Sequence, residues 1–320
     1  MKLTIWIPNF NWWELLKNTI LSIDSNLILN KNEYEILVID NCSTDNSIDI
    51  IKELQLKIKN IRLVQNDKNY WRIWNWNRVL KSSKWDRILF LMVWDKLLKF
   101  DYDKYFKNWN NNICKVFSFY EWNWNLINKH LAKKMDENFK CKTIIKISLK
   151  TLWNNYWLAI LQSHFLDRNI INKYNLEFDE NLPFLADIKF LNEYILNFKN
   201  ITFLNKANII WWMWLWKFTF KNQLDMFRDF LIYYPFAFNK YLNKNINLYK
   251  FKIYIVLRMF FIYLNNYRIW NSWFSFKEMI SFIKKDIWNL FFIVFIIFEP
   301  LYILYLYINI KTNFKYVIKF

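Results

Sequence analysis

No glycine occurs among the 320 residues of this chain, and this absence constrains its backbone more than any other feature. Glycine averages about 7% of ordinary chains, so roughly 22 would be expected at this length. It is the residue that adopts positive φ without steric cost, and tight turns depend on that freedom. The chain contains 20 tryptophans, a number close to that of the missing glycines.

Many of these tryptophans stand where the sequence otherwise indicates a turn. Residues 69–78 read N-Y-W-R-I-W-N-W-N-R, a polar stretch that follows an apolar run. The tryptophans at such positions include Trp71, Trp74, Trp85 and Trp94. Abundant Lys, Asn, Ile, Phe and Tyr indicate an AT-rich genome, in which UGA can encode glycine. We therefore expect most tryptophans to be glycine in the native protein, with Trp76 a candidate exception; the alternative is a chain truly rich in tryptophan.

The net charge of +18 indicates a partner with negative charge. Candidates are nucleic acid, an anionic membrane surface or a phosphorylated substrate, although AT-rich coding also increases the lysine content. No zinc finger, basic heptad helix or RNA-binding signature is present, so we expect no nucleic-acid partner. The three cysteines show no paired or metal-like spacing, which is typical of free thiols in a reducing compartment. With only two histidines, a histidine metal site or catalytic triad is not expected.

The first hundred residues alternate between strand and helix patterns. Strands are expected at residues 3–7, 35–39, 61–64 and 87–91. Helices are expected at residues 15–23, 43–58 and 74–83, the second of them capped from residues 43–45. This alternation predicts an α/β fold with a mostly parallel central sheet and helices on both faces. Ligands bind such sheets at the carboxyl ends of the strands, and Asp40 and Asp95 follow two of these ends.

Six segments, taken in order, resemble motifs of the family-2 glycosyltransferases. With glycine restored at Trp71, Trp74 and Trp85, they are residues 7–11, 37–47, 69–78, 84–91, 162–168 and 178–187. The resemblance covers roughly residues 1–215. It implies an A-type nucleotide-sugar-binding fold and inverting sugar transfer to a glycan or lipid-linked acceptor, as in cell-envelope polysaccharide synthesis.

The resemblance also implies an organisation and a set of donor contacts. Residues 1–105 would form the nucleotide-sugar-binding half, residues 106–216 the acceptor-binding half, and residues 217–320 a helical, aromatic-rich extension. The expected donor-binding residues are Pro8, Asn11, Asp40, Asn69 and Asn77. Asp40 would contact the base or ribose of the donor, although an aspartate after a strand also serves as a helix-entry cap.

The family usually employs a divalent cation, Mn²⁺ or Mg²⁺, and here the chain departs from the pattern. Residues 92–95 read M-V-W-D, so Asp95 is the one acid left of the family's metal motif. A single carboxylate can hold such a cation together with donor phosphates and waters. Whether the metal is required is left open, and Asp95 as a turn residue is the alternative.

Asp187 matches the family's catalytic base, which takes the proton of the acceptor hydroxyl. The acid that often precedes this base is replaced by Ala186. Asp179 and Glu180 are expected to contact the acceptor. The alternative for each of these three acids is an ordinary surface or loop carboxylate.

Three functions compete at this point. A glycosyltransferase is favoured. A nucleotidyltransferase would need a glycine-rich phosphate loop near the first strand, which even restored glycines at Trp12 and Trp13 do not provide. A catalytically degenerate relative, serving as a membrane-associated binding protein, would explain the missing metal acids. Residues 251–265 and 290–311 combine aromatic side chains with lysines, which favours a cytoplasmic protein held peripherally on the inner face of the membrane, with a packed helical cap as the alternative.

Overall fold

A computed structural model describes residues 3–107, 113–121, 126–127, 138–141, 161–211, 228–229, 232–237 and 239–241. The chain divides into two compact units, Met1–Asn245 and Ile246–Phe320, and every described residue belongs to the first. The predicted membrane-facing segments, residues 251–265 and 290–311, therefore lie outside the described residues. Within the described part, no helix is both long and apolar enough to cross a membrane.

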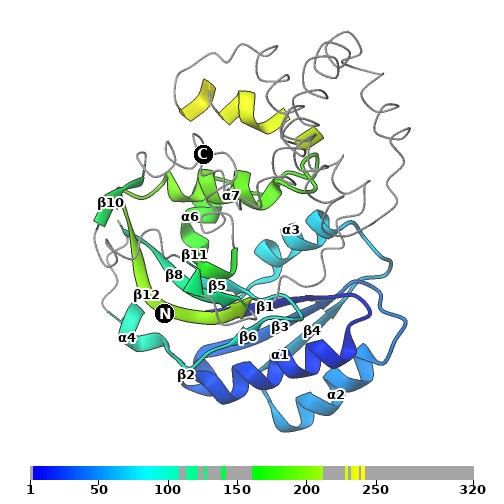
Figure 1. The fold of residues 1–320 in the computed structure, drawn as a ribbon. Coiled ribbons are helices and arrows are strands. Elements are labelled where there is room, and N and C mark those ends of the chain that lie inside the picture. The colour runs from blue at the N-terminus through cyan, green and yellow to red at the C-terminus, as the bar shows by residue number, and fades with distance from the viewer. Residues whose placement is uncertain are drawn as a thin grey trace, which may run out of the picture. The chain divides into compact units, whose positions relative to one another are not determined.

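The first unit contains a five-stranded sheet with the order β11-β5-β1-β3-β4 (Figure 1). Its strands are β1 (Leu3–Asn9), β3 (Tyr34–Asp40), β4 (Ile61–Gln65), β5 (Arg87–Phe90) and β11 (Phe165–Asp167). Four strands run parallel, and β11 pairs antiparallel with β5 at the edge. All seven residues of β3 are buried, as expected for a parallel strand covered on both faces. The predicted α/β fold with a mostly parallel sheet is confirmed.

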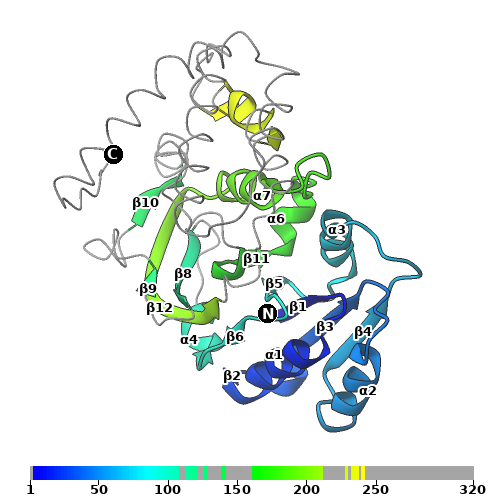
Figure 2. The same ribbon diagram turned by 45° about the vertical axis from the view of Figure 1, so that its right-hand side comes forward.

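Helices cover both faces of this sheet, as Figures 1 and 2 show. They are α1 (Trp13–Asn26), α2 (Ser47–Lys57) and α3 (Arg72–Ser82). The helices α1 and α2 lie together on one face, and α3 lies on the other. The buried positions of α1 recur at helical spacing: Leu16, Thr19, Ile20 and Ile23. This apolar stripe drives the helix onto the sheet.

A second sheet comes from the middle of the chain, where the sequence pattern is irregular. It has the order β10-β12-β8-β9, with β6 also paired to β12. Its strands are β6 (Lys96–Leu97), β8 (Ile113–Glu121), β9 (Leu126–Ile127), β10 (Asn138–Lys140) and β12 (Asn200–Trp211). A short pair, β2 (Leu27–Ile28) and β7 (Phe100–Asp101), completes the described strands. The remaining helices are η1 (Lys31–Glu33), α4 (Tyr102–Phe106), η4 (Leu161–Ser163), α6 (Arg168–Lys173) and α7 (Ala186–Ile195).

Buried phenylalanines connect the strands of the different sheets. Phe165 of β11 lies 5.1 Å from Phe100 of β7 and 5.3 Å from Phe117 of β8, measured between ring centroids. Phe106 of α4 joins the cluster at 4.8 Å from Phe165. Aromatic pairs at such distances each contribute about 0.5–1.5 kcal/mol beyond area burial. The cluster therefore fixes the second sheet against the edge of the first.

The helix starts differ slightly from the sequence-based expectation. The helix α2 begins at Ser47, and Asp45 Oδ1 accepts a hydrogen bond from Ser47 N at 3.0 Å. The helix α3 begins at Arg72, two residues before the predicted start, because Trp71 has the extended backbone of a helix-preceding residue.

Positive φ angles test one consequence of the proposed glycine recoding, namely that some tryptophans would have strained backbones. Among the described residues, the positive-φ positions are Asn11 at 57°, Cys42 at 65° and Asn175 at 48°. None is a tryptophan, so that expectation is wrong for the described residues. Trp71, however, is 89% exposed, an unusual environment for the largest apolar side chain.

Candidate functional site

Asp40 lies at the carboxyl end of β3, beside Asn9 at the end of β1. Its side chain is completely buried. Asp40 Oδ1 accepts hydrogen bonds from Asn9 Nδ2 at 2.8 Å and Ser43 Oγ at 2.5 Å, and Oδ2 accepts one from Ser43 N at 2.9 Å. Both carboxylate oxygens thus bind fixed donors of the protein and hold the loop that follows β3.

Two more of the predicted donor residues lie at the same edge. Pro8 is paired in register with Ile39, one residue before Asp40. Asn11 accepts a hydrogen bond from Thr44 N on its Oδ1 at 2.8 Å, and Asn11 N donates to Ser43 Oγ at 2.9 Å. The structure therefore brings Pro8, Asn11 and Asp40 together where β1 and β3 end.

Asn41 forms a hub that the sequence analysis did not identify. Its Nδ2 donates to Asn69 Oδ1 and to Tyr70 O, each at 2.6 Å. Its Oδ1 accepts from Asn66 Nδ2 at 2.8 Å and from Tyr70 N at 2.9 Å. The predicted donor residue Asn69 is fixed in this way beside β3. The signal was a second polar residue directly after a buried strand, which is easily taken for part of a turn.

Asp95 follows β5 in a tight turn closed by its own N–H, which donates to Met92 O at 2.9 Å. Asp95 is completely buried, and its Oδ2 accepts from Met92 N at 2.9 Å and from Gln162 Nε2 at 3.1 Å. The strands β3 and β5 are the two neighbours of β1. Asp40 therefore ends one neighbour of β1, and Asp95 lies in the turn that follows the other.

The predicted metal site requires a set of oxygen donors, and the residues at this edge do not supply one by themselves. In the described part of the chain, no three His, Cys, Asp or Glu side chains gather closely enough to hold a metal ion. One carboxylate oxygen of Asp95 already accepts hydrogen bonds from Met92 N and Gln162 Nε2. A divalent cation prefers six or more oxygen ligands, so most would have to come from donor phosphates and water. The residues do not fit a resident cation, and the steps described below do not involve one.

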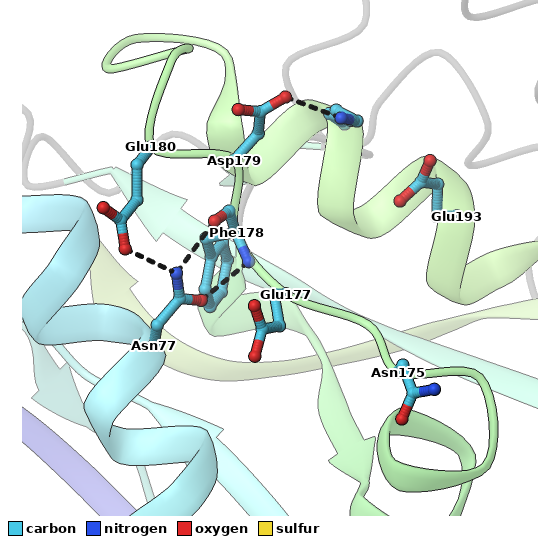
Figure 3. A pocket seen from close by; sticks show the side chains of 8 residues that line it. Asn77, Asn175, Glu177, Phe178, Asp179, Glu180 and Glu193 are labelled. Carbon is cyan, nitrogen blue, oxygen red and sulfur yellow. Dashed lines mark hydrogen bonds and ion pairs between the residues drawn. The ribbon is translucent and has the colours of Figure 1, made fainter.

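Asn77, on α3, connects this helix to the segment before α7. Its Nδ2 donates to Phe178 O at 2.9 Å, and its Oδ1 accepts from Phe178 N at 2.8 Å (Figure 3). Glu180 Oε1 lies 3.4 Å from the same Nδ2. Both ends of the Asn77 amide therefore bind the protein backbone, in the manner of a strand pair.

Asp179 and Glu180, the predicted acceptor contacts, line a pocket of about 370 Å³ (Figure 3). Its lining residues are Asn77, Asn175, Glu177, Phe178, Asp179, Glu180, Lys189 and Glu193. Lys189 Nζ lies 2.6 Å from Asp179 Oδ2. Burial would raise the pKa of Asp179, but hydrogen bonds from Lys189 and Asn181 outweigh it and hold the pKa below its usual range. The pocket is acidic, and Asp40, Asp95 and Asp187 are not among its lining residues.

Asp187 is the second residue of α7, and its Oδ1 accepts a hydrogen bond from Ile188 N at 2.8 Å. Burial raises the pKa of Asp187 to about 6; the positive charge of Arg72 opposes this shift, and the negative charge of Asp229 adds to it. A carboxyl with a pKa near 6 is ionised at neutral pH yet binds a proton more strongly than an ordinary aspartate. This is the property that a general base requires.

Two arginines of α3 lie near these groups. Arg72 donates to Pro183 O and stacks over the rings of Trp76 and Phe184, at 5.3 and 5.7 Å from their centroids. Burial lowers its pKa, and the charges of Asp187 and Asp229 oppose this effect. Arg78 donates to Asn66 Oδ1, within the network around Asn41. Both arginines thus have hydrogen-bond partners within the protein.

Comparison with known proteins gives a family for the first part of the chain. Residues 4–96 match the family described as Glycosyl transferase family 2. A stretch of 65 residues is 42% identical to TagX of Staphylococcus aureus strains MRSA252 and N315, a candidate glycosyltransferase by name. That stretch is 20% of this chain and 17% of TagX, so the chain spans less than a fifth of these curated relatives.

Solved structures show the same fold over most of the chain. The crystal structure of S. aureus TarS 1–349 in complex with UDP-GlcNAc matches with a TM-score of 0.62 at 16% identity, over 89% of this chain and 79% of that one. The TarS 1–349 structure without that ligand matches with a TM-score of 0.58 at 17% identity, over 80% and 69%. The chain therefore has the A-type nucleotide-sugar-binding fold of glycosyltransferases, as the sequence motifs predict.

Proposed function

We propose that this protein is an inverting glycosyltransferase that moves a sugar from a nucleotide-sugar donor to a glycan or lipid-linked acceptor. The observation that carries the proposal is Asp187, a half-buried carboxyl with a pKa of about 6 at the start of α7, in a chain with this fold. The match of residues 4–96 to the glycosyltransferase family supports the same conclusion.

The residues divide the reaction between them. Asp187 takes the proton of the acceptor hydroxyl while that oxygen forms a bond to the anomeric carbon of the sugar. The bond from this carbon to the diphosphate breaks, the leaving oxygen keeps the electron pair, and the configuration inverts. The edge formed by Pro8, Asn11 and Asp40, with Asn69 beside it, binds the nucleotide. TarS was crystallised with UDP-GlcNAc, so a uridine diphosphate sugar is the donor to test first.

Asp179 and Glu180 have a separate place in the proposal. They line the acidic pocket and are assigned to the acceptor, whose hydroxyl groups would replace the contacts of Glu180 with Asn77. Asn77 itself is left out of the donor site because both ends of its amide bind Phe178. This assignment places the acceptor beside α3 and α7.

The direct test is release of UDP from UDP-GlcNAc by the unmodified protein, measured with and without Mn²⁺. A glycosyltransferase releases UDP slowly without acceptor, by transfer of the sugar to water, and faster with a suitable glycan or lipid-linked sugar, by transfer to the acceptor hydroxyl. The competing function is that of a degenerate relative which binds but does not react, and it is favoured by the single acid of the metal motif. Donor binding by calorimetry without any UDP release over many hours would support this competitor.

Peripheral attachment to the inner face of the cytoplasmic membrane belongs to the same proposal. The net charge of +18 and the apolar, aromatic segments at residues 251–265 and 290–311 support it. The full chain should sediment with vesicles containing phosphatidylglycerol and remain unbound with neutral phosphatidylcholine vesicles. Equal binding to both, or to neither, would contradict an electrostatic attachment.

Glycine at most tryptophan positions is the last part of the proposal. Trp71, which is 89% exposed, is the strongest case, and Trp74, Trp85 and Trp94 are the others. Mass spectrometry of peptides from the native organism should find glycine at these four positions. Trp6 and Trp76 are expected to be genuine, since both are buried.

The packing of Trp6 and Trp76 explains this exception. Trp6 lies 4.2 Å from Phe90, and Trp76 lies 5.3 Å from Phe178, between ring centroids. Removing either indole would leave a large cavity, at a cost of about 3–5 kcal/mol. Tryptophan in the native peptides at all six positions would contradict the recoding.

A further inference from the structure

The segment just before α7 is held from two sides by groups of opposite charge. Arg72, at the start of α3, donates to Pro183 O. Asp229 accepts on its Oδ2 from Phe184 N at 2.7 Å and from Leu185 N at 3.1 Å. A cation therefore binds the carbonyl of this segment, and an anion binds its next two N–H groups.

These contacts lie directly before the first turn of α7, at Phe184 and Leu185. The residue before α7 is Leu185, whose side chain cannot cap, and no side-chain cap hydrogen bond is present. The first N–H groups of a helix have no partner within the helix, and the positive end of its dipole favours a negative charge nearby. Asp229 supplies that charge from more than forty residues further along the chain.

Because Asp229 is buried, loss of these hydrogen bonds would leave polar groups without partners and would destabilise the protein. Asp229 is completely buried, and its Oδ1 lies 3.6 Å from Arg228 Nη2. A buried carboxylate is tolerated when hydrogen bonds and opposite charge compensate its lost hydration. Burial raises the pKa of Asp229, and the hydrogen bonds from Phe184 N and Leu185 N oppose that rise. The charged groups that face one another here are Arg72, Asp187, Arg228 and Asp229.

We propose that Asp229 is a positioning residue for Asp187: with Arg72 it clamps residues 183–185 and thereby fixes where the base lies. The inference rests on the proposed role of Asp187 as the base. Asp187 is two residues beyond the clamped Leu185, so movement of this segment moves its carboxyl directly. Small displacements of a catalytic group from its reactive geometry cost large factors in rate.

The clamp acts on charge as well as on position. Asp229 raises the pKa of Asp187, and Arg72 lowers it. An acid usually precedes the base in the family that this chain resembles, and here that position is Ala186. Asp229 therefore brings a second carboxyl to the base through the fold instead of through the neighbouring sequence position.

The test is the Asp229→Asn variant, which removes the charge and keeps an oxygen that can accept from the two N–H groups. With UDP-GlcNAc hydrolysis as the readout, kcat should fall roughly tenfold with little change in KM. The acidic limb of the pH–rate profile should also move down by about half a pH unit or more, since a negative neighbour is lost. A purely structural role would not move this limb.

Asp101→Asn is the matched control. Asp101 also caps a helix, accepting on its Oδ1 from Lys104 N at 3.1 Å at the start of α4. It is not among the groups that influence Asp187, so its variant should leave the limb in place. An unmoved or upward-moved limb in Asp229→Asn, with Asp187→Asn inactive, would overturn the inference and leave the proposed function intact. An active Asp187→Asn would instead remove the proposed function of that residue.

A second measurement needs neither activity nor a folded variant. Carbon NMR of the unmodified protein, labelled at aspartate carboxyl carbons, follows Asp187 and Asp229 through a pH titration. We expect the Asp187 signal to titrate near pH 6 and to respond a second time when Asp229 titrates. A single Asp187 titration near pH 4, without any response to Asp229, would overturn the inference.

Discussion

Asp40 ends the strand β3 and Asp187 lies in the first turn of the helix α7, and the surroundings of the two carboxylates differ. Asp40 is completely buried, and its oxygens accept three hydrogen bonds from Asn9 and Ser43. Asp187 accepts from Ile188 N of its own helix turn and has burial and the charges of two distant residues acting on its pKa. Donors fixed around a carboxylate stabilise its charged form, whereas burial favours its protonation. The first arrangement builds a scaffold, and the second suits a proton acceptor.

The largest expected effect tests the reactive side of this comparison. Asp187→Asn should lower turnover about 10²- to 10⁴-fold, because the proton acceptor is lost while the side-chain shape is retained. Affinity for UDP-GlcNAc, measured by calorimetry, should stay nearly constant, since Asp187 acts on the acceptor. Turnover at the parent rate would show that another residue is the base, and Glu180 or Asp179 would be tested next.

A suitable control for this variant is Asp103→Asn. Asp103 is an exposed acid on α4. The substitution changes the net charge by the same amount, and turnover should stay within twofold of the parent. An equal loss in both variants would attribute the effect to overall charge instead of to the base.

The second prediction concerns the scaffold side. Asp40→Ala should lower the free energy of unfolding by about 2–4 kcal/mol, because Asn9 Nδ2 and Ser43 N lose their acceptor in a buried site. From the sequence alone, the main expected effect of Asp40→Ala is weaker binding of the donor. The structure adds a loss of stability, since every described bond of the Asp40 carboxylate is internal. Urea unfolding followed by circular dichroism measures it.

Ser43→Ala provides the graded comparison for Asp40→Ala. It removes the hydroxyl that donates to Asp40 Oδ1 and accepts from Asn9 Nδ2 and Asn11 N, and it keeps the backbone bond from Ser43 N to Asp40 Oδ2. The expected loss is about 1 kcal/mol. A stable Asp40→Ala variant with weakened donor binding would restore the simpler view of Asp40 as a ligand contact.

The difference between the two regions also explains what the sequence could predict. The strands and helices of the first ninety residues follow from local patterns, such as the apolar run that ends at Asp40. Asp40 and its loop lie in one motif, residues 37–47, and its strand partner Asn9 lies in another, residues 7–11. The second sheet was not predicted because its parallel pair joins β8 and β12, which are distant in sequence and have no regular pattern.

The region around Asp187 shows the same limit at the level of single residues. Asp187 itself could be identified by resemblance to a family motif. Asp229 could not, because the contact of its carboxylate with Phe184 N and Leu185 N depends on the folded path of the chain. The assignment of Asn77 to the donor stays a prediction, and its amide hydrogen-bonds the backbone of Phe178, 101 residues away. Local patterns identify which residue types follow the strands. Long-range packing decides which of these side chains hydrogen-bond to other parts of the protein.

The third prediction concerns the pH–activity profile of an Arg72→Gln variant, which depends on the charges around the base. Arg72 lowers the pKa of Asp187, so Arg72→Gln should raise that pKa above about 6. Since the base must be ionised to act, the acidic limb of the activity profile should move to higher pH. This direction is opposite to the one expected for Asp229→Asn. Glutamine keeps an N–H that can donate to Pro183 O, so the loop contact has a substitute.

Lys81→Gln separates a local effect from a general one. Lys81 is a cation on the same helix, and it pairs with Glu177 at 3.2 Å on the exposed side. Its loss should leave the limb where it is. Equal shifts in both variants would indicate a long-range charge effect and would weaken the distinction between Asp187 and the scaffold acids.

The smallest expected effect is a change in stability from a substitution at Cys42, in the loop that follows Asp40. Cys42 follows Asp40 by two residues and has a φ of 65°, in the left-handed region that costs about 1–2 kcal/mol for residues other than glycine. Glycine removes this strain but loses more entropy on folding, about 0.5–1 kcal/mol. Cys42→Gly should therefore stabilise the protein by up to about 1 kcal/mol, measured by urea unfolding. Asn175→Gly is the matched control, since asparagine tolerates its φ of 48° and should gain little. If Cys42→Gly is destabilising, the loop after Asp40 depends on the cysteine side chain, which lies 4.0 Å from Asp67 O, more than on backbone geometry.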